Sequence, residues 1–404
     1  MNEIVIVGAG QSAAQCIIAL RKGGFNNPIT LIGEESHLPY QRPPLSKDYL
    51  SDEAPIERVF MKPEEFFIKE KIKVIKSTKA TSINRERNTV VLENGENIKY
   101  KKLILATGSR VRRIEVEGSE LKNINYLRTL DDANAIKKFL KSGKKLVIVG
   151  AGYIGLEVAA VAVEKGLDVT VIEMADRVMN RTVDPIISEY FYNLHTSKGV
   201  KIILNSALVK FEGQKSVEKV ICSNGDSLKA DGVIIGAGIL PNQEIAESCN
   251  LECNNGIVVN EHGQTQDKDI YACGDCTNHP NPSLNKRLRL ESVHNALEQA
   301  KTVALNLMGE KHSYDQVPWF WSDQYEHKLQ IVGISGNHDR TLIRGSIDEK
   351  SFMVFYLKNN ELIAVDSVNN SKDFLVSKKL VANKLKISSD ILCDQSVDLK
   401  NLIT

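Results

Sequence analysis

Two glycine-rich turns of one design occur in this chain, and their spacing suits the binding of two dinucleotides. Each turn follows an apolar run, at 4–7 and at 146–149, and opens a stretch of helical composition rich in alanine and leucine. Such a turn lets the backbone approach a pyrophosphate, whose charge then lies at a helix N-terminus. The small residues at the fixed positions are Gly8, Gly10 and Ala13 in the first turn and Gly150, Gly152 and Gly155 in the second.

An acidic residue follows each turn at the distance that a ribose requires. Glu34 closely follows the apolar run 29–32, and Glu173 follows the run 169–172. A carboxylate about twenty residues after the turn accepts hydrogen bonds from ribose hydroxyls. The glycine pattern alone is weak evidence for a nucleotide site. The strands before the turns and the acids after them favour nucleotide binding over the alternative, in which the two turns bind no ligand. The sequence therefore predicts two dinucleotide sites.

Two further segments indicate which nucleotide belongs to which turn. The run 103–108 has the pattern of a strand that ends in Thr107 and Gly108, and the run 270–275 has that of a strand that ends in Asp275. A turn that packs against the first nucleotide and a carboxylate for a ribitol hydroxyl are what a bound flavin requires. Together with the first glycine turn, these segments resemble the FAD-binding signature of two-dinucleotide flavoproteins. The first site is predicted to hold FAD and the second a nicotinamide nucleotide.

The order of these motifs predicts an α/β fold in which an NAD domain is inserted into a split FAD domain, both Rossmann-like. In the tail, apolar runs at 352–357 and 361–368 predict a β-hairpin and 372–385 a helix, hence a C-terminal α+β domain. A chain of 404 residues is long enough for two or three domains. The expected FAD, NAD and C-terminal domains span residues 1–110 with 238–316, 111–237 and 317–404, respectively.

Charge and composition exclude some classes of partner. Lysine and arginine number 52 against 51 acidic residues, so the net charge of +1 gives no global attraction to nucleic acid or to a membrane. The apolar stretch 146–163 contains Glu157 and the second glycine turn, which argues against a membrane span. The first apolar run begins too early to leave room for a targeting peptide, and we expect a cytoplasmic protein without a metal site.

The seven cysteines are scattered and odd in number, which is typical of a reducing compartment. Cys273 and Cys276 have the spacing of a redox pair, but the residues between them are those assigned to the flavin, and a redox-active pair is the weaker alternative. The segment 35–49 contains no cysteine. The chain thus lacks the thiol that disulfide and peroxide reductases of this architecture place beside the flavin.

Four segments together resemble the NADH-dependent ferredoxin reductases. They are the double-proline run 37–47, the second glycine turn 150–157, and the segments 291–296 and 318–324. The resemblance covers essentially the whole chain. It implies an NADH:ferredoxin oxidoreductase, in which hydride passes from NADH to the flavin N5 and electrons leave one at a time to a 2Fe-2S ferredoxin. That ferredoxin would serve a cytochrome P-450 or a similar oxygenase.

The resemblance also implies contacts to the cofactors. Those to FAD are Ser12, Glu34, Lys47, Ala80, Arg128, Asp275 and Val293. The other positions expected near a cofactor are Tyr153, Ile154, Arg181, Glu291 and Trp321. For Ala80 and Val293 the alternative is core packing. Trp321 and its neighbour Trp319 could shield the flavin or fill an inter-domain core, and the sequence supports both equally. His294 departs from the residues usual in the family.

Lys47 and Glu157 are the residues expected to act nearest the chemistry. The family places them as a salt bridge beside the flavin, and buried opposite charges are stable only when paired. Since 2Fe-2S ferredoxins are usually acidic, a basic docking face is also expected, with Lys301, Lys328 and Lys378 among its members. Two other functions stay open: a reductase for rubredoxin or another acceptor, and a regulatory flavoprotein of the apoptosis-inducing-factor type.

Overall fold

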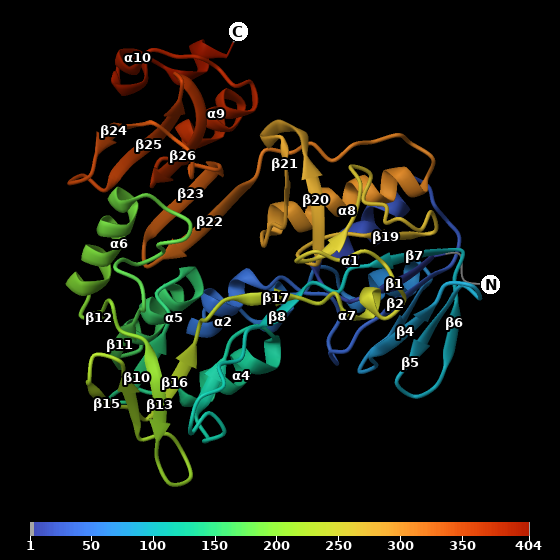
Figure 1. Ribbon diagram of the computed structural model, residues 1–404, viewed down its shortest axis with the longest axis horizontal. Helices are drawn as coiled ribbons and strands as arrows, with labels where there is room; N and C mark the ends of the chain where they lie inside the picture. The colour runs from blue at the N-terminus through green and yellow to red at the C-terminus, as the bar shows by residue number, and fades with distance from the viewer. Residues whose placement is uncertain (1–3, 404) are drawn as a thin grey trace. The chain divides into compact units, whose positions relative to one another are not determined.

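The computed structural model describes residues 4–403 and divides into two compact units. Unit 1 contains the segments that end at Gln41 and that span Pro55–Arg110 and Ile239–Pro318. Unit 2 contains Arg42–Ala54, Val111–Gly238 and the chain from Trp319 onward. Figure 1 shows how the chain leaves unit 1 as β8 (Ser109–Val111) and returns as β17 (Ile239–Pro241).

The centre of unit 1 is a five-stranded parallel sheet in the order β19-β7-β1-β2-β3. Helices α1 (Gln11–Lys22) and α8 (Val293–Leu307) pack side by side on one face, as Figure 1 shows. The antiparallel strands β4 to β6 cover the other face. The bounds of these strands are β1 Ile4–Val7, β2 Ile29–Ile32, β3 Ile72–Ile75, β4 Ala80–Asn84, β5 Thr89–Leu92, β6 Asn97–Lys99, β7 Lys102–Leu105 and β19 Ile270–Ala272.

Strand β1 is buried on both faces, which explains its uninterrupted apolar run. Ile4 and Ile6 belong to the core beneath α1 and α8, whereas Val5 and Val7 belong to the core beneath β4 to β6. Successive side chains of a strand point to opposite faces, and a parallel sheet covered on both sides is apolar at every position. The remaining elements of unit 1 are η2 Ile56–Arg58, α3 Glu64–Lys69, α7 Glu244–Glu247, β18 Ile257–Val258, β20 Thr277–Asn281, η3 Pro282–Leu284 and β21 Lys286–Leu288.

Unit 2 repeats this design around the second glycine turn. Its parallel sheet has the order β12-β11-β10-β16-β9, and the antiparallel sheet β13-β14-β15 covers one face, where Val147 and Val149 meet Phe211 and Val220. The strands are β9 Ile124–Tyr126, β10 Lys145–Val149, β11 Asp168–Ile172, β12 Lys201–Ile203, β13 Leu208–Glu212, β14 Lys219–Cys222, β15 Ser227–Lys229 and β16 Gly232–Ile235. The helices are α4 Leu130–Phe139, α5 Tyr153–Glu164 and α6 Pro185–Ser197.

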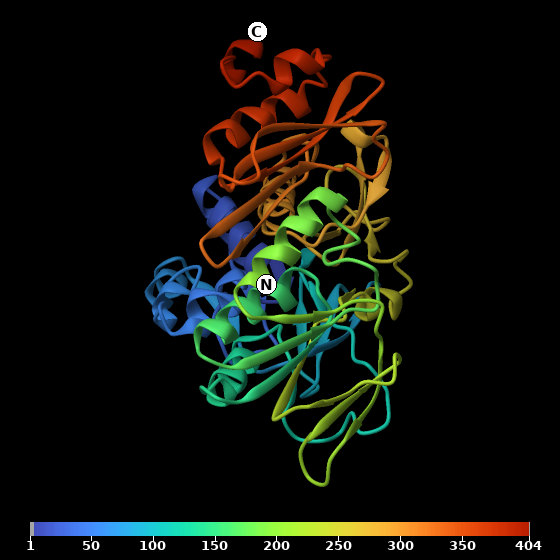
Figure 2. The same ribbon diagram turned by 90° about the vertical axis from the view of Figure 1, so that its left-hand side faces the viewer.

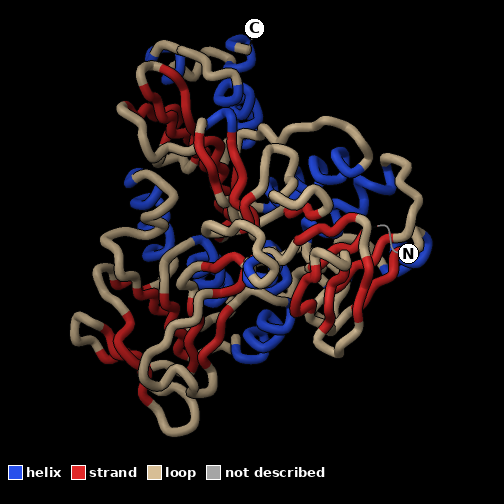
Figure 3. Tube along the Cα trace, turned by 45° about the vertical axis from the view of Figure 1, so that its right-hand side comes forward, coloured by secondary structure: helices blue, strands red, loops and turns tan. Residues whose placement is uncertain are grey.

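The C-terminal part of unit 2 is an antiparallel sheet with helices on one side. The sheet has the order β22-β23-β26-β25-β24, and α9 (Ser371–Ala382) packs against β23 and β26 (Figure 2). Figure 3 separates these strands and helices by colour. The strands are β22 Trp319–Gln324, β23 His327–Gly333, β24 Arg340–Ser346, β25 Ser351–Lys358 and β26 Glu361–Val368, followed after α9 by α10 Ser389–Cys393 and η4 Leu399–Leu402.

The predicted fold class is confirmed, and so is the hairpin in the tail. Strands β25 and β26 pair antiparallel with Lys358 opposite Glu361. The two residues between them, Asn359 and Asn360, have φ of +51° and +63°. Asparagine tolerates this left-handed backbone, and two such residues form the turn whose twist matches a hairpin.

One segment groups differently from the expected domain boundaries. Residues 42–54, which contain η1 (Pro43–Ser46) and α2 (Asp48–Ser51), belong to unit 2 because they pack against α4 and α5. The apolar stretch 146–163 is divided between β10 and α5. Within residues 4–403 the structure has no helix with the length and apolar character that crossing a bilayer requires.

Candidate functional site

The small residues of the two glycine turns have three distinct structural roles. Gly8 and Gly150 have φ of +101° and +103°, where only glycine is unstrained, and a Cβ on either would collide with a carbonyl oxygen of the neighbouring strand's end. Gly155 packs against the turn itself, since its Cβ would collide with the oxygen of Gly150. By contrast, a Cβ on Gly10 or Gly152 would meet no atom within 4 Å. The turns are therefore closed toward the protein and open where a pyrophosphate approaches the backbone.

The helices that follow these turns also lack side-chain caps. The N-cap residues of α1 and α5 are Gly10 and Gly152, and neither provides a side-chain cap for its helix. The other described helices of ten or more residues, α4, α6, α8 and α9, are each capped by a side chain. The positive end of the helix dipole and the first-turn N–H groups of an α-helix suit a phosphate anion, and α1 and α5 both point this end at a glycine turn. The residues present thus fit one dinucleotide at each turn.

In unit 1 the structure brings Ser12, Asp275 and the start of α8 to the first turn. Ser12 donates a hydrogen bond from Oγ to the oxygen of Ala296 at 2.9 Å. A Cβ on Gly274, which precedes Asp275, would lie 3.0 Å from Ser12 Oγ. Asp275 is half-buried and accepts a hydrogen bond from Ser109 Oγ at 2.8 Å. Val293 is the first residue of α8, and its backbone lies where the helix dipole favours negative charge.

The remaining predicted residues of unit 1 lie at the carboxyl ends of the sheet strands or beside them. Glu34 follows β2 and has a side chain 71% exposed, with Lys79 Nζ at 3.8 Å. Ala80 is the next residue after Lys79 and begins β4. Thr107 follows β7 and donates from Oγ1 to the oxygen of Asn242 at 2.6 Å. Glu291, before α8, pairs with Arg289 at 2.7 Å.

In unit 2 Glu173 is fixed at the second turn. Its Oε2 accepts from the N–H of Ala151 at 2.7 Å, and its Oε1 accepts from the N–H of Ala175 at 2.9 Å. The carboxylate is thereby held at the end of β11, where a ribose would bind. Two nearby arginines follow Glu173 closely enough in the sequence to reach a phosphate. Arg177 donates to backbone oxygens of its own loop, whereas Arg181 is exposed.

The side chains that open α5 differ in exposure. Tyr153 packs its ring 4.6 Å from that of Phe320, between centroids, and burial raises the pKa of its hydroxyl. Ile154 is 41% exposed. Trp321 stacks on Trp319 with centroids 5.4 Å apart, and both rings remain partly exposed.

The predicted ion pair of Lys47 and Glu157 is present and nearly buried. Lys47 Nζ lies 2.7 Å from Glu157 Oε2, and the two side chains are 14% and 4% exposed. Two serines complete the coordination of the carboxylate: Ser46 Oγ donates to Oε2 at 2.5 Å and Ser322 Oγ donates to Oε1 at 2.6 Å. Arg128 lies on the same unit, where its oxygen accepts from Arg42 Nη1 at 2.5 Å. A cavity of ≈ 40 Å³ is lined by Arg42, Arg128, Ser46 and Ile154, among others.

Cys273 and Cys276 are free thiols and are fully buried. Burial raises the pKa of the Cys273 thiol to about 12 and also raises the pKa of Cys276. A neutral buried thiol is a poor nucleophile. The pair therefore behaves as part of the core beside the Asp275 turn.

Comparisons with known proteins agree with this geometry. The model of the pyridine nucleotide-disulphide oxidoreductase family matches residues 2–300, which is most of the chain. The chain belongs to this family. A second model, described as the reductase C-terminal domain, matches residues 319–403.

Several relatives are similar to this chain over nearly their full lengths. Putidaredoxin reductase of Pseudomonas putida is 40% identical, covering 100% of this chain and 97% of the relative. Rhodocoxin reductase of Rhodococcus erythropolis is 40% identical, with coverage of 98% and 93%. The solved structure of a covalent putidaredoxin reductase-putidaredoxin complex aligns with a TM-score of 0.97 at 40% identity, covering 100% of this chain and 98% of that one. Members of the family use FAD and a nicotinamide nucleotide, and this oxidoreductase does likewise.

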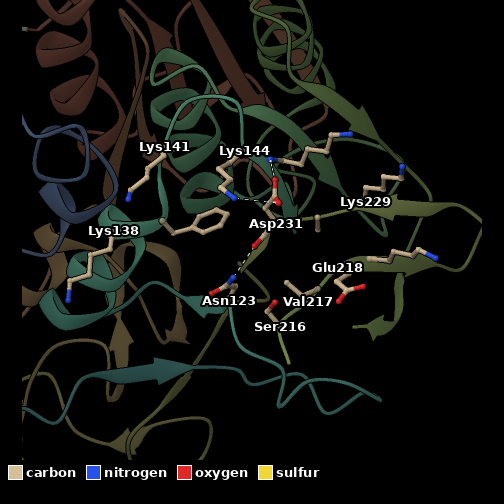
Figure 4. A pocket seen from close by; sticks show the side chains of 13 residues that line it. Asn123, Lys138, Lys141, Lys144, Ser216, Val217, Glu218, Lys229 and Asp231 are labelled. Carbon is tan, nitrogen blue, oxygen red and sulfur yellow. Dashed lines mark hydrogen bonds and ion pairs between the residues drawn. The ribbon is translucent and has the colours of Figure 1, made fainter. Parts of the chain in front are cut away.

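One cavity of unit 2 is separate from the second glycine turn of this oxidoreductase. It measures ≈ 690 Å³ and is lined by lysines, among them Lys138, Lys141 and Lys229 (Figure 4). Lys144 turns toward Asp231 and pairs with it at 3.7 Å. Lys145, also in the lining, begins β10, whose other end leads to Gly150, roughly 17 Å away at the rise of a strand. Ligands of parallel sheets bind at the carboxyl ends of the strands, and this cavity lies at the opposite end.

Sequence reasoning missed Ser46 and Ser322, which contact Glu157, and His195, whose Nε2 lies 2.8 Å from Oε1 of Gln324 on the same strand as Ser322. Ser46 is adjacent to Lys47 and lies in the double-proline segment, which was a usable signal. Ser322 lies in the segment 318–324 that carries the family resemblance, but its residue type and spacing alone do not distinguish it from other strand serines. His195 falls on the buried face of α6 with Ile187 and Phe191, a periodicity that predicts core packing.

Proposed function

We propose that this oxidoreductase takes electrons from NADH and delivers them, through FAD, to a 2Fe-2S ferredoxin that serves a cytochrome P-450 or a similar oxygenase. Bound FAD supplies the conversion of a two-electron donor into single electrons. The observation that carries the proposal is the pair of open, uncapped glycine turns in one chain, one in each unit. The ferredoxin as acceptor is supported by full-length similarity to reductases whose names specify one.

The cofactor sites are assigned accordingly as part of the proposal. Residues 1–110 and 238–316 form the FAD domain, 111–237 the NAD domain and 317–404 the C-terminal domain. Ser12, Glu34, Ala80, Asp275 and Val293 hold FAD, together with Lys47 and Arg128. The second turn and Glu173 hold NADH, with Tyr153, Ile154 and Arg181 beside it.

Lys47 and Glu157 have a positioning role in this proposal. The ammonium of Lys47 is directed by the carboxylate of Glu157, the fifth residue of α5, and α5 is the helix proposed to receive the NADH pyrophosphate. A charge held at one atom in this way orients the nicotinamide and does not act as a nucleophile.

The seven unpaired cysteines support a cytoplasmic location, which fractionation of the native host would test.

The test is NADH-driven reduction of a 2Fe-2S ferredoxin from the same organism, followed through cytochrome c. Fast ferredoxin-dependent turnover with slow turnover on oxygen supports the proposal. Ferredoxin-independent turnover at the same rate would refute it.

One second candidate has a specific observation in its favour. The rubredoxin-NAD(+) reductase of Pseudomonas putida is 38% identical, covering 91% of this chain and 96% of the relative. Parallel assays with rubredoxin and ferredoxin at equal concentration separate the two acceptors by kcat/KM. Turnover that is slow with every acceptor, combined with NADH-dependent binding of a protein partner, would instead indicate a regulatory flavoprotein.

A further inference from the structure

The carboxylate of Glu157 is the centre of a hydrogen-bond network that extends well beyond Lys47. Its three donors come from two separate segments of unit 2: the loop that contains Ser46 and Lys47, and strand β22, which contains Ser322. Ser322 has no exposed surface, and its hydroxyl is the described side-chain donor to Oε1. The C-terminal sheet therefore holds one oxygen of a carboxylate whose other oxygen holds Lys47.

Ser322 is in turn oriented by Gln324 and His195. Gln324 Nε2 donates to Ser322 Oγ at 3.1 Å, and Gln324 Oε1 lies 2.8 Å from His195 Nε2. Tyr325, half-buried, places its hydroxyl 3.3 Å from His195 Nδ1. These side chains are a connected set reaching from the hairpin turn after β22 to Glu157.

The donors in this set all point one way. Because Gln324 Nε2 donates to Ser322, Gln324 Oε1 must accept from His195 Nε2–H. The other nitrogen of a neutral imidazole is then the acceptor for the Tyr325 hydroxyl. Burial lowers the pKa of His195 to about 4, so the ring is neutral near pH 7 as this pattern requires. Ser322 has one hydroxyl proton, and with Gln324 occupying its acceptor side that proton is directed at Glu157.

We propose that Ser322, oriented by Gln324 and His195, is a positioning residue for flavin reduction by NADH: it fixes Glu157 and, through Glu157, the ammonium of Lys47. The inference rests on the proposed function, because it requires that Lys47 stand beside the reacting cofactors. A carboxylate with one oxygen released rotates about its terminal bond, and the lysine that it holds moves with it. Buried polar networks of this kind specify one geometry when every member is satisfied.

The test is stopped-flow reduction of the FAD-loaded protein by NADH. Ser322→Ala should lower the limiting rate of flavin reduction about 10-fold, since a displacement of 1 Å at a reacting group costs on the order of 100-fold and the release here is partial. The apparent Kd for NADH should stay within about 2-fold, because the pyrophosphate and ribose contacts are unchanged. Ser322→Thr, which keeps the hydroxyl, should restore most of the rate, and Gln324→Ala should produce a smaller loss than Ser322→Ala.

A matched control and a double variant separate positioning from general damage. Ser367 is also a fully buried serine of the same sheet, and its hydroxyl donates to the oxygen of Asn370, so Ser367→Ala tests loss of a buried hydroxyl without touching Glu157. If Ser322 acts through Lys47, Ser322→Ala should lower the rate little further in a Lys47→Ala background.

The outcomes are distinguishable. A rate unchanged by Ser322→Ala but lowered by Lys47→Ala overturns the role of Ser322 alone. Additive losses in the double variant, or equal losses with Ser367→Ala, overturn it as well. A rate unchanged by Lys47→Ala removes the role proposed for the ion pair itself.

Discussion

The open space at Gly152 makes a prediction that separates ligand binding from folding. Gly152 precedes α5 with φ −79° and ψ −178°, a backbone that alanine adopts without strain. A Cβ there would meet no protein atom within 4 Å. Gly152→Ala should therefore change the free energy of unfolding by no more than about 1 kcal/mol. Alanine restricts the unfolded chain, which stabilises the fold, but it is a poorer N-cap residue than glycine, which destabilises it.

The substitution should instead weaken the binding of NADH. A backbone N–H binds a phosphate oxygen at about 2.9 Å, whereas a methyl carbon needs roughly 3.5 Å from the same oxygen. The pyrophosphate must withdraw by several tenths of an ångström, which weakens at least one charge-assisted hydrogen bond worth about 1.5–3 kcal/mol. Since every 1.4 kcal/mol is tenfold, the KM for NADH should rise about 10- to 100-fold.

The assay is steady-state oxidation of NADH with ferricyanide, combined with thermal unfolding. Gly336→Ala is the matched control, because a Cβ at Gly336 also meets open space and its φ lies outside the left-handed region. That variant should leave KM unchanged. An unchanged KM in Gly152→Ala, with FAD still bound, would refute the placement of the NADH pyrophosphate at this turn.

Three further expectations concern other residues. Glu173→Ala should reduce the preference for NADH over NADPH, because the carboxylate that would repel a 2′-phosphate is gone; comparable kcat/KM for both nucleotides in the unaltered protein would contradict this. Lys378 Nζ lies 4.1 Å from the centroid of Trp319. Lys378→Glu should raise the KM for ferredoxin and flatten its salt dependence while ferricyanide reduction is unchanged, and equal loss with both acceptors would exclude a docking role. Burial raises the pKa of Asp366 to about 7, so this carboxyl keeps its proton when the unfolded chain has lost it, and its contribution to stability declines as pH rises from about 4 toward 7. Asp366→Asn should remove that decline, which amounts to at most about 1.4 kcal/mol per pH unit, and denaturant titrations of the variant and the unaltered protein at several pH values would measure it. His195, whose pKa is lowered, adds a slope of the opposite sign in both proteins, so it cancels in the comparison.

Local features of this protein were predictable from the sequence. The glycine turns were predictable because only glycine adopts the positive φ of Gly8 and Gly150 without strain. The hairpin was predictable because Asn359 and Asn360 suit a two-residue turn. The ion pair of Lys47 and Glu157 was accessible only through resemblance to a family, since 110 positions separate its members.

Other features depend on packing that no short pattern records. Ser322 reaches Glu157 across 165 positions, and a single serine in a strand carries no periodic signal. The grouping of residues 42–54 with α4 and α5 likewise arises from tertiary contact, whereas motif order places them with the first nucleotide turn. Arg177 was a plausible phosphate ligand by position, but carbonyl oxygens of its own loop engage its guanidinium.

The uncapped starts of α1 and α5 make the nucleotides structural partners of the chain as well as reactants. A ligand that binds only the folded state stabilises it by about 2.7 kcal/mol at 100 times its Kd, and a phosphate here would also accept hydrogen bonds at two helix starts whose N-cap glycines provide no side-chain cap. We therefore expect the supply of FAD to affect the amount of folded protein as well as its activity. When flavin is scarce, chains without FAD lose this stabilisation, and a larger fraction of them should unfold and be degraded. Abundance measured against riboflavin supply would report on this coupling without any enzyme assay.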